Sequence, residues 1–379
     1  MIGSNENYNF LEVPSASSAS FAPQSAQDWP AILGRPAYQP ASITIPGLTG
    51  RTVLVTGAGG FIGSAMVRLL AASGAAEIVL LEIAEQQLFA IFSEMTAGGC
   101  GDCCVPVLGS VCDRRLLRAL LDEHPPHLIL HAAALKHVPL MERNPFAAVA
   151  TNAIGTWILA ELAAECGVPR AVLISTDKAV APHSIMGASK RIAELATLAH
   201  GFTALRLVNV AGSPGSVGPI FAEQIAGGGP ITVTHPAARR FFFTLDQVVQ
   251  LLGEAIEAKD PAGILIPDPG EPLLIEELAR RMIAASGRKA SILFTEPRPG
   301  DKLDESLVGP RERLGDRAAP GLHRVFGPAV SGLEAGIAAL ESAIALRNLP
   351  ALLREVERLV PDYEPSALLR GAVSALPSL

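Results

Sequence analysis

Short apolar runs recur through the first half of the chain, separated by longer segments of mixed apolar and polar character. The runs are rich in β-branched residues and lack strict alternation, which is typical of strands buried on both faces of a parallel sheet. They lie at residues 52–56, 77–81, 105–108, 127–131, 170–175 and 203–208.

The segments between these runs are long enough to form helices. Their apolar positions predict helices over residues 62–72, 114–123, 145–166 and 185–200. Because strand, helix and strand repeat in this order, the sequence predicts an α/β fold with a doubly wound parallel sheet of the Rossmann type and right-handed crossovers.

Beyond residue 208 the pattern is less regular, and glycine- and proline-rich connections separate helical patches at 246–258, 273–285 and 334–346. We interpret this part as a smaller α/β substrate-binding domain beside the carboxyl ends of the strands, where α/β sheets bind ligands. The predicted divisions are a Rossmann domain at 49–208, a return to it at 243–267, and a substrate-binding domain with C-terminal helices at 209–379.

The chain ahead of the first strand divides in two. Residues 1–28 are rich in Ser, Ala, Asn and Pro without periodicity, so we expect a flexible arm. Residues 29–48 are more apolar and contain several prolines, which predicts an extended strap packed on the domain that follows.

Composition narrows the classes of function. With 379 residues and 49% hydrophobic content the chain can bury a large core. A net charge of -7 argues against a protein whose main partner is nucleic acid or an anionic membrane surface. We find no apolar stretch of about 20 residues and no signal peptide, and therefore expect a cytoplasmic protein with no membrane partner.

Four of the five cysteines lie between Cys100 and Cys112. Cys100 and Cys103 have the C-x-x-C spacing, but no second pair or histidine cluster follows to complete four zinc ligands. We expect reduced cysteines on a loop and a short strand rather than a metal or redox site.

A glycine-rich segment after the first strand indicates a dinucleotide. Glycines at Gly57, Gly60 and Gly63 allow a tight turn and a close approach to a pyrophosphate, whose charge meets the free N–H groups of the helix start. Glu82 ends the second strand, where a carboxylate accepts hydrogen bonds from the adenosine ribose. No Arg follows Glu82 closely, which favours NAD over NADP. The expected cofactor-binding residues are Gly57, Gly60, Phe61, Ile62, Gly63, Glu82, Ala132, Ala133 and Lys190.

Longer strings resemble one family. The glycine spacing and the Met186-x-x-x-Lys190 pair resemble the extended short-chain dehydrogenase/reductases, and within them the polysaccharide-biosynthesis branch of nucleotide-sugar 4,6-dehydratases. The best known members act on UDP-N-acetylglucosamine. The matching strings run from about residue 32 to residue 303 and include VLVTGAGGFIGS, HAAALKHVPLMERNP, TNAIGT, LISTDKAVAPHSIMGASKR, NVAGSPGSVGPIF and RPGDKL.

Met186 stands where such enzymes commonly have an acid/base tyrosine. A thioether cannot exchange a proton, but a methionine variant is known in the family, so Met186 does not by itself indicate an inactive protein. By resemblance, Thr176 would bond the carbon 4 oxygen, Asp177 would protonate the departing carbon 6 hydroxyl, and Lys178 would take the proton from carbon 5. The group that deprotonates the carbon 4 hydroxyl stays open.

Lys178 needs a lowered pKa to act as a base. Lys190, which the resemblance places at the nicotinamide ribose, and the nicotinamide itself favour this, whereas Asp177 opposes it. The balance of these effects on the Lys178 pKa is open. Met186 would pack beside the sugar or the nicotinamide ring. Without the family match, a surface ion pair at a strand end is the favoured explanation for Asp177 and Lys178.

The resemblance also implies a pocket for a UDP-sugar, lined by amide and arginine side chains. The candidate substrate-binding residues are Lys136, His137, Asn209, Ser216, Arg240 and Arg298. Turn residues, surface arginines and an exposed Lys136–His137 pair are the alternatives. Ser184 is a candidate helix cap, Asn152 is either solvent-facing or a polar brace, and Phe241 to Phe243 are expected in the core.

Some positions depart from the family pattern. Ser110 stands where an adenine-binding Asp is common, Val208 replaces a usual Gly, and Asp304 replaces a frequent aromatic. The segment after Lys190 is also about ten residues shorter than usual. The Ser110 change leaves adenine recognition open, and Val208 and the shorter segment lie beside the expected sugar pocket, where they could alter substrate choice.

We therefore expect an NAD-dependent 4,6-dehydratase acting on a UDP-N-acetylhexosamine. A carbon 4 epimerase on the same scaffold is the alternative enzyme, although it has no use for Asp177, and a non-catalytic NAD-binding relative is the alternative from another class. Helices 145–166 and 185–200 pair subunits in this superfamily, so we expect a homo-oligomer.

Overall fold

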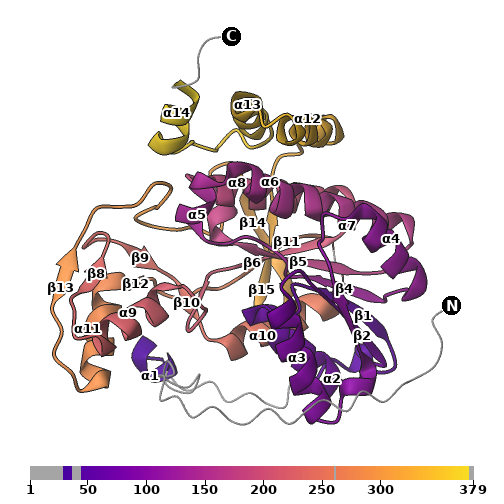
Figure 1. Cartoon of the computed structure of the whole chain (residues 1–379), viewed down its shortest axis with the longest axis horizontal. Helices are drawn as coiled ribbons and strands as arrows, with labels where there is room; N and C mark the ends of the chain where they lie inside the picture. The colour runs from indigo at the N-terminus through magenta and orange to yellow at the C-terminus, as the bar shows by residue number, and fades with distance from the viewer. Residues whose placement is uncertain (1–28, 36–43, 260–261, 375–379) are drawn as a thin grey trace.

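The computed structural model describes residues 29–35, 44–259 and 262–374. Within this part of the chain, nine strands form one large sheet in the order β14-β15-β11-β6-β5-β4-β1-β2-β3 (Figure 1). The predicted flexible arm and part of the predicted strap, at residues 36–43, lie outside the described residues.

Six strands of the sheet match the predicted apolar runs closely. Seven of its strands pair in parallel with one another, and the antiparallel pairs are β11 with β15 and β15 with β14. The parallel strands are β1 (Thr52–Thr56), β2 (Glu77–Glu82), β3 (Cys104–Leu108), β4 (Leu128–His131), β5 (Ala171–Thr176), β6 (Thr203–Leu207) and β11 (Gly263–Pro267). The strand order reverses between β1 and β4, and such a reversal opens a crevice for a ligand at the carboxyl ends of these strands.

Helices cover both faces of the sheet, because successive side chains on each strand point in opposite directions. In β1, Val53 and Val55 belong to one apolar cluster and Leu54 to another. The first cluster includes side chains of α2 (Phe61–Ala72), α3 (Glu85–Ala97) and α10 (Leu245–Glu257). The second includes side chains of α4 (Arg114–Glu123), α5 (Val138–Arg143), α6 (Pro145–Val149), α7 (Gly155–Glu165), α8 (Ile185–Ala199), α12 (Leu333–Ala345), α13 (Leu349–Leu359) and α14 (Ala367–Ser374).

By length and composition, the helical segment Pro145–Glu165 could cross a membrane. The expectation that the chain has no apolar stretch of about 20 residues was therefore wrong. It consists of α6, a π-helical turn at Ala150–Ile154 and α7. However, 72% of its apolar window is buried inside the fold. A helix that is apolar on all sides is also typical of a protein core, and this one is packed as a core helix.

Helices α7 and α8 were expected to pair subunits. On a single chain both are almost fully buried, with only a few side chains at their C-terminal ends exposed. Part of the cover comes from α12 and α13, which pack on α6, α8 and the π-helical turn (Figure 1).

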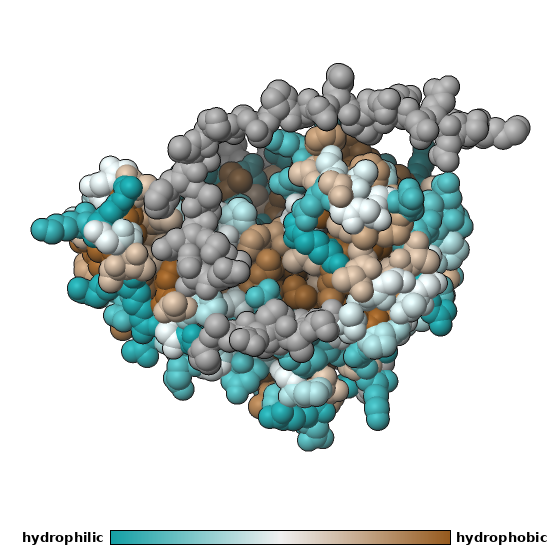
Figure 2. All heavy atoms as spheres, turned by 90° about the horizontal axis from the view of Figure 1, so that it is seen from below, coloured by the Kyte–Doolittle hydropathy of each residue, from teal (hydrophilic) through white to brown (hydrophobic). Residues whose placement is uncertain are grey.

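The second domain has its own apolar cluster, formed by residues of α9 (Val217–Ala226), α11 (Ile275–Ser286) and short strands. The short strands pair as β7 (Asn209–Val210) with β10 (Phe242–Phe243), β8 (Ile231–Val233) with β13 (Ile292–Phe294), and β9 (Arg239–Arg240) with β12 (Leu273–Leu274). Figure 2, seen from below Figure 1, shows apolar side chains at the floor of a hollow between the two domains.

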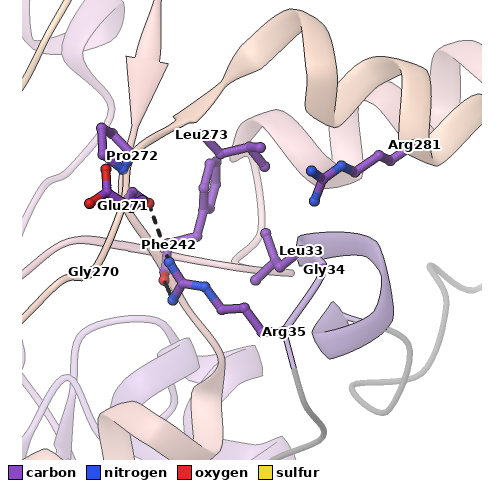
Figure 3. A pocket seen from close by; sticks show the side chains of 9 residues that line it. All are labelled: Leu33, Gly34, Arg35, Phe242, Gly270, Glu271, Pro272, Leu273 and Arg281. Carbon is purple, nitrogen blue, oxygen red and sulfur yellow. Dashed lines mark hydrogen bonds between the residues drawn. The ribbon is translucent and has the colours of Figure 1, made fainter.

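The predicted strap is not extended at its start. Trp29–Leu33 form helix α1, and its buried side chains join the apolar cluster of the second domain. Arg35 then donates from Nη1 to the Phe242 carbonyl oxygen at 2.7 Å, beside a pocket of about 310 Å³ (Figure 3). Ile45 and Leu48, in contrast, pack in the core of the large domain. The described parts of the strap therefore contact both domains.

The large domain also contains elements that the sequence did not predict there. β14 (Arg313–Ala319) and β15 (Leu322–Phe326) form an antiparallel hairpin at the edge of the large sheet. β14 is mostly exposed, so it lacks the apolar run that marks a buried strand. Short 3-10 turns complete the described elements at Pro46–Leu48, Gly101–Cys103 and Asp177–Ala179.

Candidate active site

The glycine turn after β1 is closely packed. Gly57 has a φ of +67°, and a Cβ atom there would lie 2.7 Å from the Ala133 backbone nitrogen. A Cβ at Gly63 would overlap the Gly57 carbonyl oxygen. Both positions therefore exclude a larger residue, and the start of α2 lies directly against the turn.

The N-terminus of α2 fits an anionic group. Gly60 is the N-cap, and within the described residues no side chain caps it. The first N–H groups of a helix have no partner inside the helix, so those near Phe61 and Ile62 point toward the space above the turn. Both side chains are partly buried against the large core, which leaves the backbone as the part available to a pyrophosphate.

Glu82 lies at the end of β2 beside this turn. Its carboxylate accepts hydrogen bonds from the backbone N–H groups of Gly59 at 3.2 Å, Ile83 at 2.9 Å and Ala84 at 3.0 Å. The local backbone thus holds a carboxylate next to the glycine turn, where an adenosine ribose would offer its hydroxyl groups. The donor set fits a dinucleotide.

A buried polar chain links the ends of β1 and β4, and the sequence analysis did not identify it. His131 Nδ1 lies 2.7 Å from Thr56 Oγ1, and its Nε2 lies 2.8 Å from Thr156 Oγ1. Burial, and then the charge of Lys190, lower the pKa of His131 to about 3. Because the imidazole is neutral, it can act as donor and acceptor between the two hydroxyl groups.

Asn152 is fully buried, so the solvent-facing alternative is wrong. Its side chain accepts from the Leu135 N–H at 2.8 Å and donates to the Leu135 carbonyl oxygen at 3.0 Å. It also donates to Ser189 Oγ at 3.0 Å. Asn152 therefore braces the loop after β4 against α8.

The end of β5 carries the predicted acid/base residues. Asp177 is fully buried, which excludes the interpretation of a surface ion pair. Its Oδ1 atom accepts from Thr176 Oγ1 at 2.9 Å and from Lys178 Nζ at 3.0 Å. Lys178 Nζ also donates to Asn209 Oδ1 at 3.1 Å. The structure thus brings four of the sequence-predicted residues together.

A fifth residue completes this cluster and was missed. Glu305 Oε1 lies 2.9 Å from Lys178 Nζ and 3.2 Å from Arg240 Nε, and its side chain is only 2% exposed. Its Oε2 accepts from Asn209 Nδ2 at 3.1 Å. The only signal in the sequence was its place just after the RPGDKL string. An acidic residue after a turn gives no indication of burial.

The charges in this cluster are strongly coupled. Burial raises the pKa of Asp177 to about 7, and Glu305 adds to this while Lys178 opposes it. Burial alone would lower the pKa of Lys178, but the carboxylates of Asp177 and Glu305 outweigh it and raise the pKa instead. The balance left open by the sequence therefore favours an ammonium group on Lys178, not a free amine.

Helix α8 presents Lys190 and Met186. Lys190 Nζ donates to the Ile174 carbonyl oxygen of β5 at 2.7 Å, and burial lowers its pKa to about 8. Met186 is buried in the apolar core of the large domain. The Ser184 side chain accepts from the Gly187 N–H at 3.1 Å, which confirms that Ser184 caps this helix.

The two arginines expected at the diphosphate contact protein groups. Arg240 donates to the carbonyl oxygens of Lys302 at 2.7 Å and Leu303 at 3.0 Å. Arg298 pairs with Asp301 at 2.9 Å and is half exposed. Arg240 thus holds the loop that carries Glu305, whereas Arg298 lies in an exposed turn.

Lys136 and His137 contact the loop of the second domain that was expected to bind the nucleotide sugar. Lys136 Nζ donates to Ser213 Oγ at 2.7 Å and to the Pro214 carbonyl oxygen at 2.9 Å. A Cβ at Gly215 would lie 2.5 Å from His137 Cε1. Ser216 ends this loop as the N-cap of α9. The loops of the two domains therefore contact each other at these residues.

A buried ion network lies between the large sheet and the segment that follows Glu305. Arg206 on β6 is fully buried and pairs with Glu194 of α8 at 2.8 Å and with Glu312 at 2.6 Å. It also donates to the Leu307 carbonyl oxygen at 2.8 Å. Arg206 therefore fixes the loop that contains Glu305 to the large sheet.

Phe242 and Phe243 are buried and Phe241 packs against the core, as predicted. The cysteines in the described part of the chain are free, and burial is the main factor that raises the pKa of Cys104 to about 12. In residues 29–35, 44–259 and 262–374, no group of three His, Cys, Asp or Glu side chains could hold a metal ion.

Comparison with known proteins agrees with this architecture. The family described as polysaccharide biosynthesis protein matches residues 53–325. The chain is 42% identical over 340 residues to the probable polysaccharide biosynthesis protein EpsC of Bacillus subtilis, covering 86% of this chain and 54% of that protein. It is 41% identical over 277 residues to the capsular polysaccharide biosynthesis protein CapD of Staphylococcus aureus, covering 70% and 46%. The chain thus spans about half the length of these curated relatives.

A more distant relative is the UDP-glucose 4-epimerase of Rickettsia rickettsii, 36% identical over 198 residues, which cover 50% of this chain and 58% of the epimerase. Among solved structures, Pen from Bacillus thuringiensis has a TM-score of 0.69 at 25% identity, over 75% of this chain and 90% of its own. The dTDP-glucose 4,6-dehydratase DesIV from Streptomyces venezuelae, solved with NAD and TYD bound, has a TM-score of 0.61 at 26% identity, over 68% and 88%.

Proposed function

Because the chain belongs to the polysaccharide biosynthesis protein family and is related to nucleotide-sugar dehydratases and epimerases, we propose that it is an NAD-dependent 4,6-dehydratase. Its proposed substrate is UDP-N-acetylglucosamine and its product a 4-keto-6-deoxy sugar nucleotide, made in the cytoplasm. The observation that carries the proposal is the buried Asp177 carboxyl, hydrogen-bonded to Lys178 at the end of β5.

A 4,6-dehydratase needs an acid and a base close together. The acid assists departure of the carbon 6 hydroxyl, and the base removes the proton from carbon 5. Asp177 suits the acid because its raised pKa, about 7, lets it keep a proton near neutral pH, where an ordinary aspartate does not. An epimerase has no step that uses this proton.

Lys178 suits the base only as an amine. Its Nζ lies 3.0 Å from Asp177 Oδ1, so one proton can move between them and convert ammonium and carboxylate into amine and acid without a change in the number of protons. Lys178 then takes the carbon 5 proton and later returns a proton to carbon 5. Asp177 gives its proton to the hydroxyl, which leaves as water. Over a full cycle, the proton that the carbon 4 hydroxyl loses replaces the proton that Asp177 gave up.

The residues around the glycine turn would hold NAD, with Glu82 at the adenosine ribose and the start of α2 at the pyrophosphate. Bound NAD would accept the hydrogen of carbon 4 and return it to carbon 6. Lys190 would bind the nicotinamide ribose, and Thr176 would bond the carbon 4 oxygen beside Asp177. The absence of an arginine soon after Glu82 supports NAD rather than NADP.

For the UDP-sugar, we propose contacts from the loop at 212–216 and from Lys136 and His137, which already lie against it. Arg298 is half exposed and pairs with Asp301 of its own turn, and we propose that it exchanges this partner for a phosphate. Asn209 would act at the cluster itself, because both ends of its amide are bonded there.

The proposal is tested by incubating the purified chain and NAD with UDP-N-acetylglucosamine and analysing the products by mass spectrometry. We expect a product lighter than the substrate by one water. An isomer of unchanged mass would instead favour a carbon 4 epimerase, which the Rickettsia relative makes the second candidate. Lack of turnover with UDP-, dTDP- and GDP-sugars, despite NAD binding, would favour a non-catalytic relative.

A further inference from the structure

Glu305 reaches the acid/base cluster from a loop far along the chain, and both of its carboxylate oxygens are occupied. Oε1 binds Lys178 and Arg240, at 2.9 and 3.2 Å, while Oε2 accepts from Asn209 at 3.1 Å. With 2% of its side chain exposed, this is a buried charge with several partners rather than a surface carboxylate that happens to lie nearby.

Asp177 is the less well satisfied of the two carboxyl groups. Its Oδ1 atom accepts from Thr176 and Lys178, but no donor among the described residues reaches its buried Oδ2 atom, and a hydrogen bond with the Glu305 carboxyl raises the pKa of Asp177. A buried anionic oxygen without a donor is costly, whereas the same oxygen carrying a proton is not charged. Glu305 has more hydrogen-bond donors around its carboxylate than Asp177 has. Glu305 therefore holds a negative charge more easily, and Asp177 holds a proton more easily.

The loop that carries Glu305 is held in place independently of these contacts. Arg206 binds the carbonyl oxygen of Leu307, Arg240 binds those of Lys302 and Leu303, and Lys302 Nζ donates to the Val180 carbonyl oxygen at 2.5 Å. The position of Glu305 is therefore set by the fold on both sides of the residue, not by attraction to Lys178 alone.

We propose that Glu305 is a positioning residue of this site, whose fixed negative charge holds the Lys178 ammonium between two carboxyl groups and makes Asp177 retain its proton. The charged groups that face this pair are Lys178, Arg240 and Lys302. The kinetic consequence of this inference rests on the proposed function, but the protonation of Asp177 does not.

The direct test is the titration of Asp177 in the full-length protein with NAD added. Carbon-13 spectra of protein labelled at aspartate carboxyl carbons follow each group, and the Asp177 signal is the one lost in Asp177→Asn. We expect Asp177 to titrate near pH 7 in the unchanged protein. In Glu305→Gln the midpoint should fall by about one pH unit or more, since a like charge nearby is removed.

Asp304→Asn is the matched control, because it removes the same charge from the adjacent, exposed position and should leave the midpoint unchanged. A midpoint in the ordinary aspartate range in the unchanged protein would overturn the inference, whether or not the variants fold. The same midpoint in Glu305→Gln and in the unchanged protein would overturn it as well.

Activity gives a second reading. If Asp177 and Lys178 work with one proton between them, the rate rises as pH increases through the Asp177 midpoint, and in Glu305→Gln this rise moves to lower pH. A lower rate with no shift of the pH profile would indicate a merely structural role and overturn the inference. If the unchanged protein turns over no sugar nucleotide but Asp177 still titrates as expected, the proposed function fails and the role of Glu305 stands.

Discussion

The cofactor turn and the acid/base cluster both lie at the carboxyl ends of strands, but the chain assembles them in different ways. The turn comes from one continuous segment, Gly57 to Gly63, with Glu82 from the next strand. The cluster combines the end of β5 with Asn209, Arg240 and Glu305, which come from separate segments of the chain. The first site depends on local backbone geometry and the second on tertiary packing of charges.

The largest effect is expected at the turn. Gly63→Val places a side chain where even a Cβ overlaps the Gly57 carbonyl oxygen, so α2 must move and the pyrophosphate site is lost. We expect NAD binding to be lost altogether in isothermal titration calorimetry. Gly47→Ala is the control, since a Cβ at Gly47 has no atom within 4 Å among the described residues. Normal NAD binding by Gly63→Val would contradict a closely packed turn.

The support of the cluster should be next in size. Arg206→Leu leaves Glu194 and Glu312 buried without their main cation, and removing one partner of a buried pair costs about 3–5 kcal/mol. The free energy of unfolding in urea measures this loss. Arg68→Leu breaks an exposed pair with Glu94 and should cost about 1 kcal/mol or less. Equal losses in the two variants would show that burial does not distinguish these pairs.

These two sites also explain what the sequence could predict. The strands, the glycine turn and Glu82 were predictable because they follow from short-range patterns of apolar residues and glycine. Arg206 in an apolar strand and Glu305 after a turn carry no such pattern, since each is stabilised only by partners distant in the chain. The hairpin of β14 and β15 was missed for a related reason, because an exposed edge strand lacks an apolar run.

At the cluster itself, Asp177→Asn keeps the shape of the side chain but removes the proton donor. We expect kcat to fall by about 1000-fold, within the range ascribed to general acid catalysis, while NAD affinity stays within about twofold. Asp304→Asn, at an exposed position of the neighbouring loop, should retain full activity. Full activity of Asp177→Asn would remove the acid role from this residue.

The smallest effect is expected where the strap meets the second domain. Trp29 is buried, and Cβ atoms at Gly212 or Gly218 would collide with its indole ring, so the ring supports the loop that contacts Lys136 and His137. Trp29→Ala should raise KM for the UDP-sugar by about tenfold. Trp29→Phe keeps an aromatic ring, so its KM should lie closer to that of the unchanged protein. NAD affinity should not change in either variant. A roughly tenfold loss of NAD affinity in Trp29→Ala would show that the substitution disturbs the large domain as well as the second domain.

The central claim is that Asp177 and Lys178 move protons at carbons 5 and 6 of a nucleotide sugar. The most direct measurement is the reaction of the full chain with NAD and UDP-N-acetylglucosamine in deuterated water, analysed by mass spectrometry and NMR. The Nζ hydrogens of Lys178 exchange with solvent, so we expect a product that has lost one water and carries one deuterium at carbon 5. A product of unchanged mass without deuterium bound to carbon would contradict the claim.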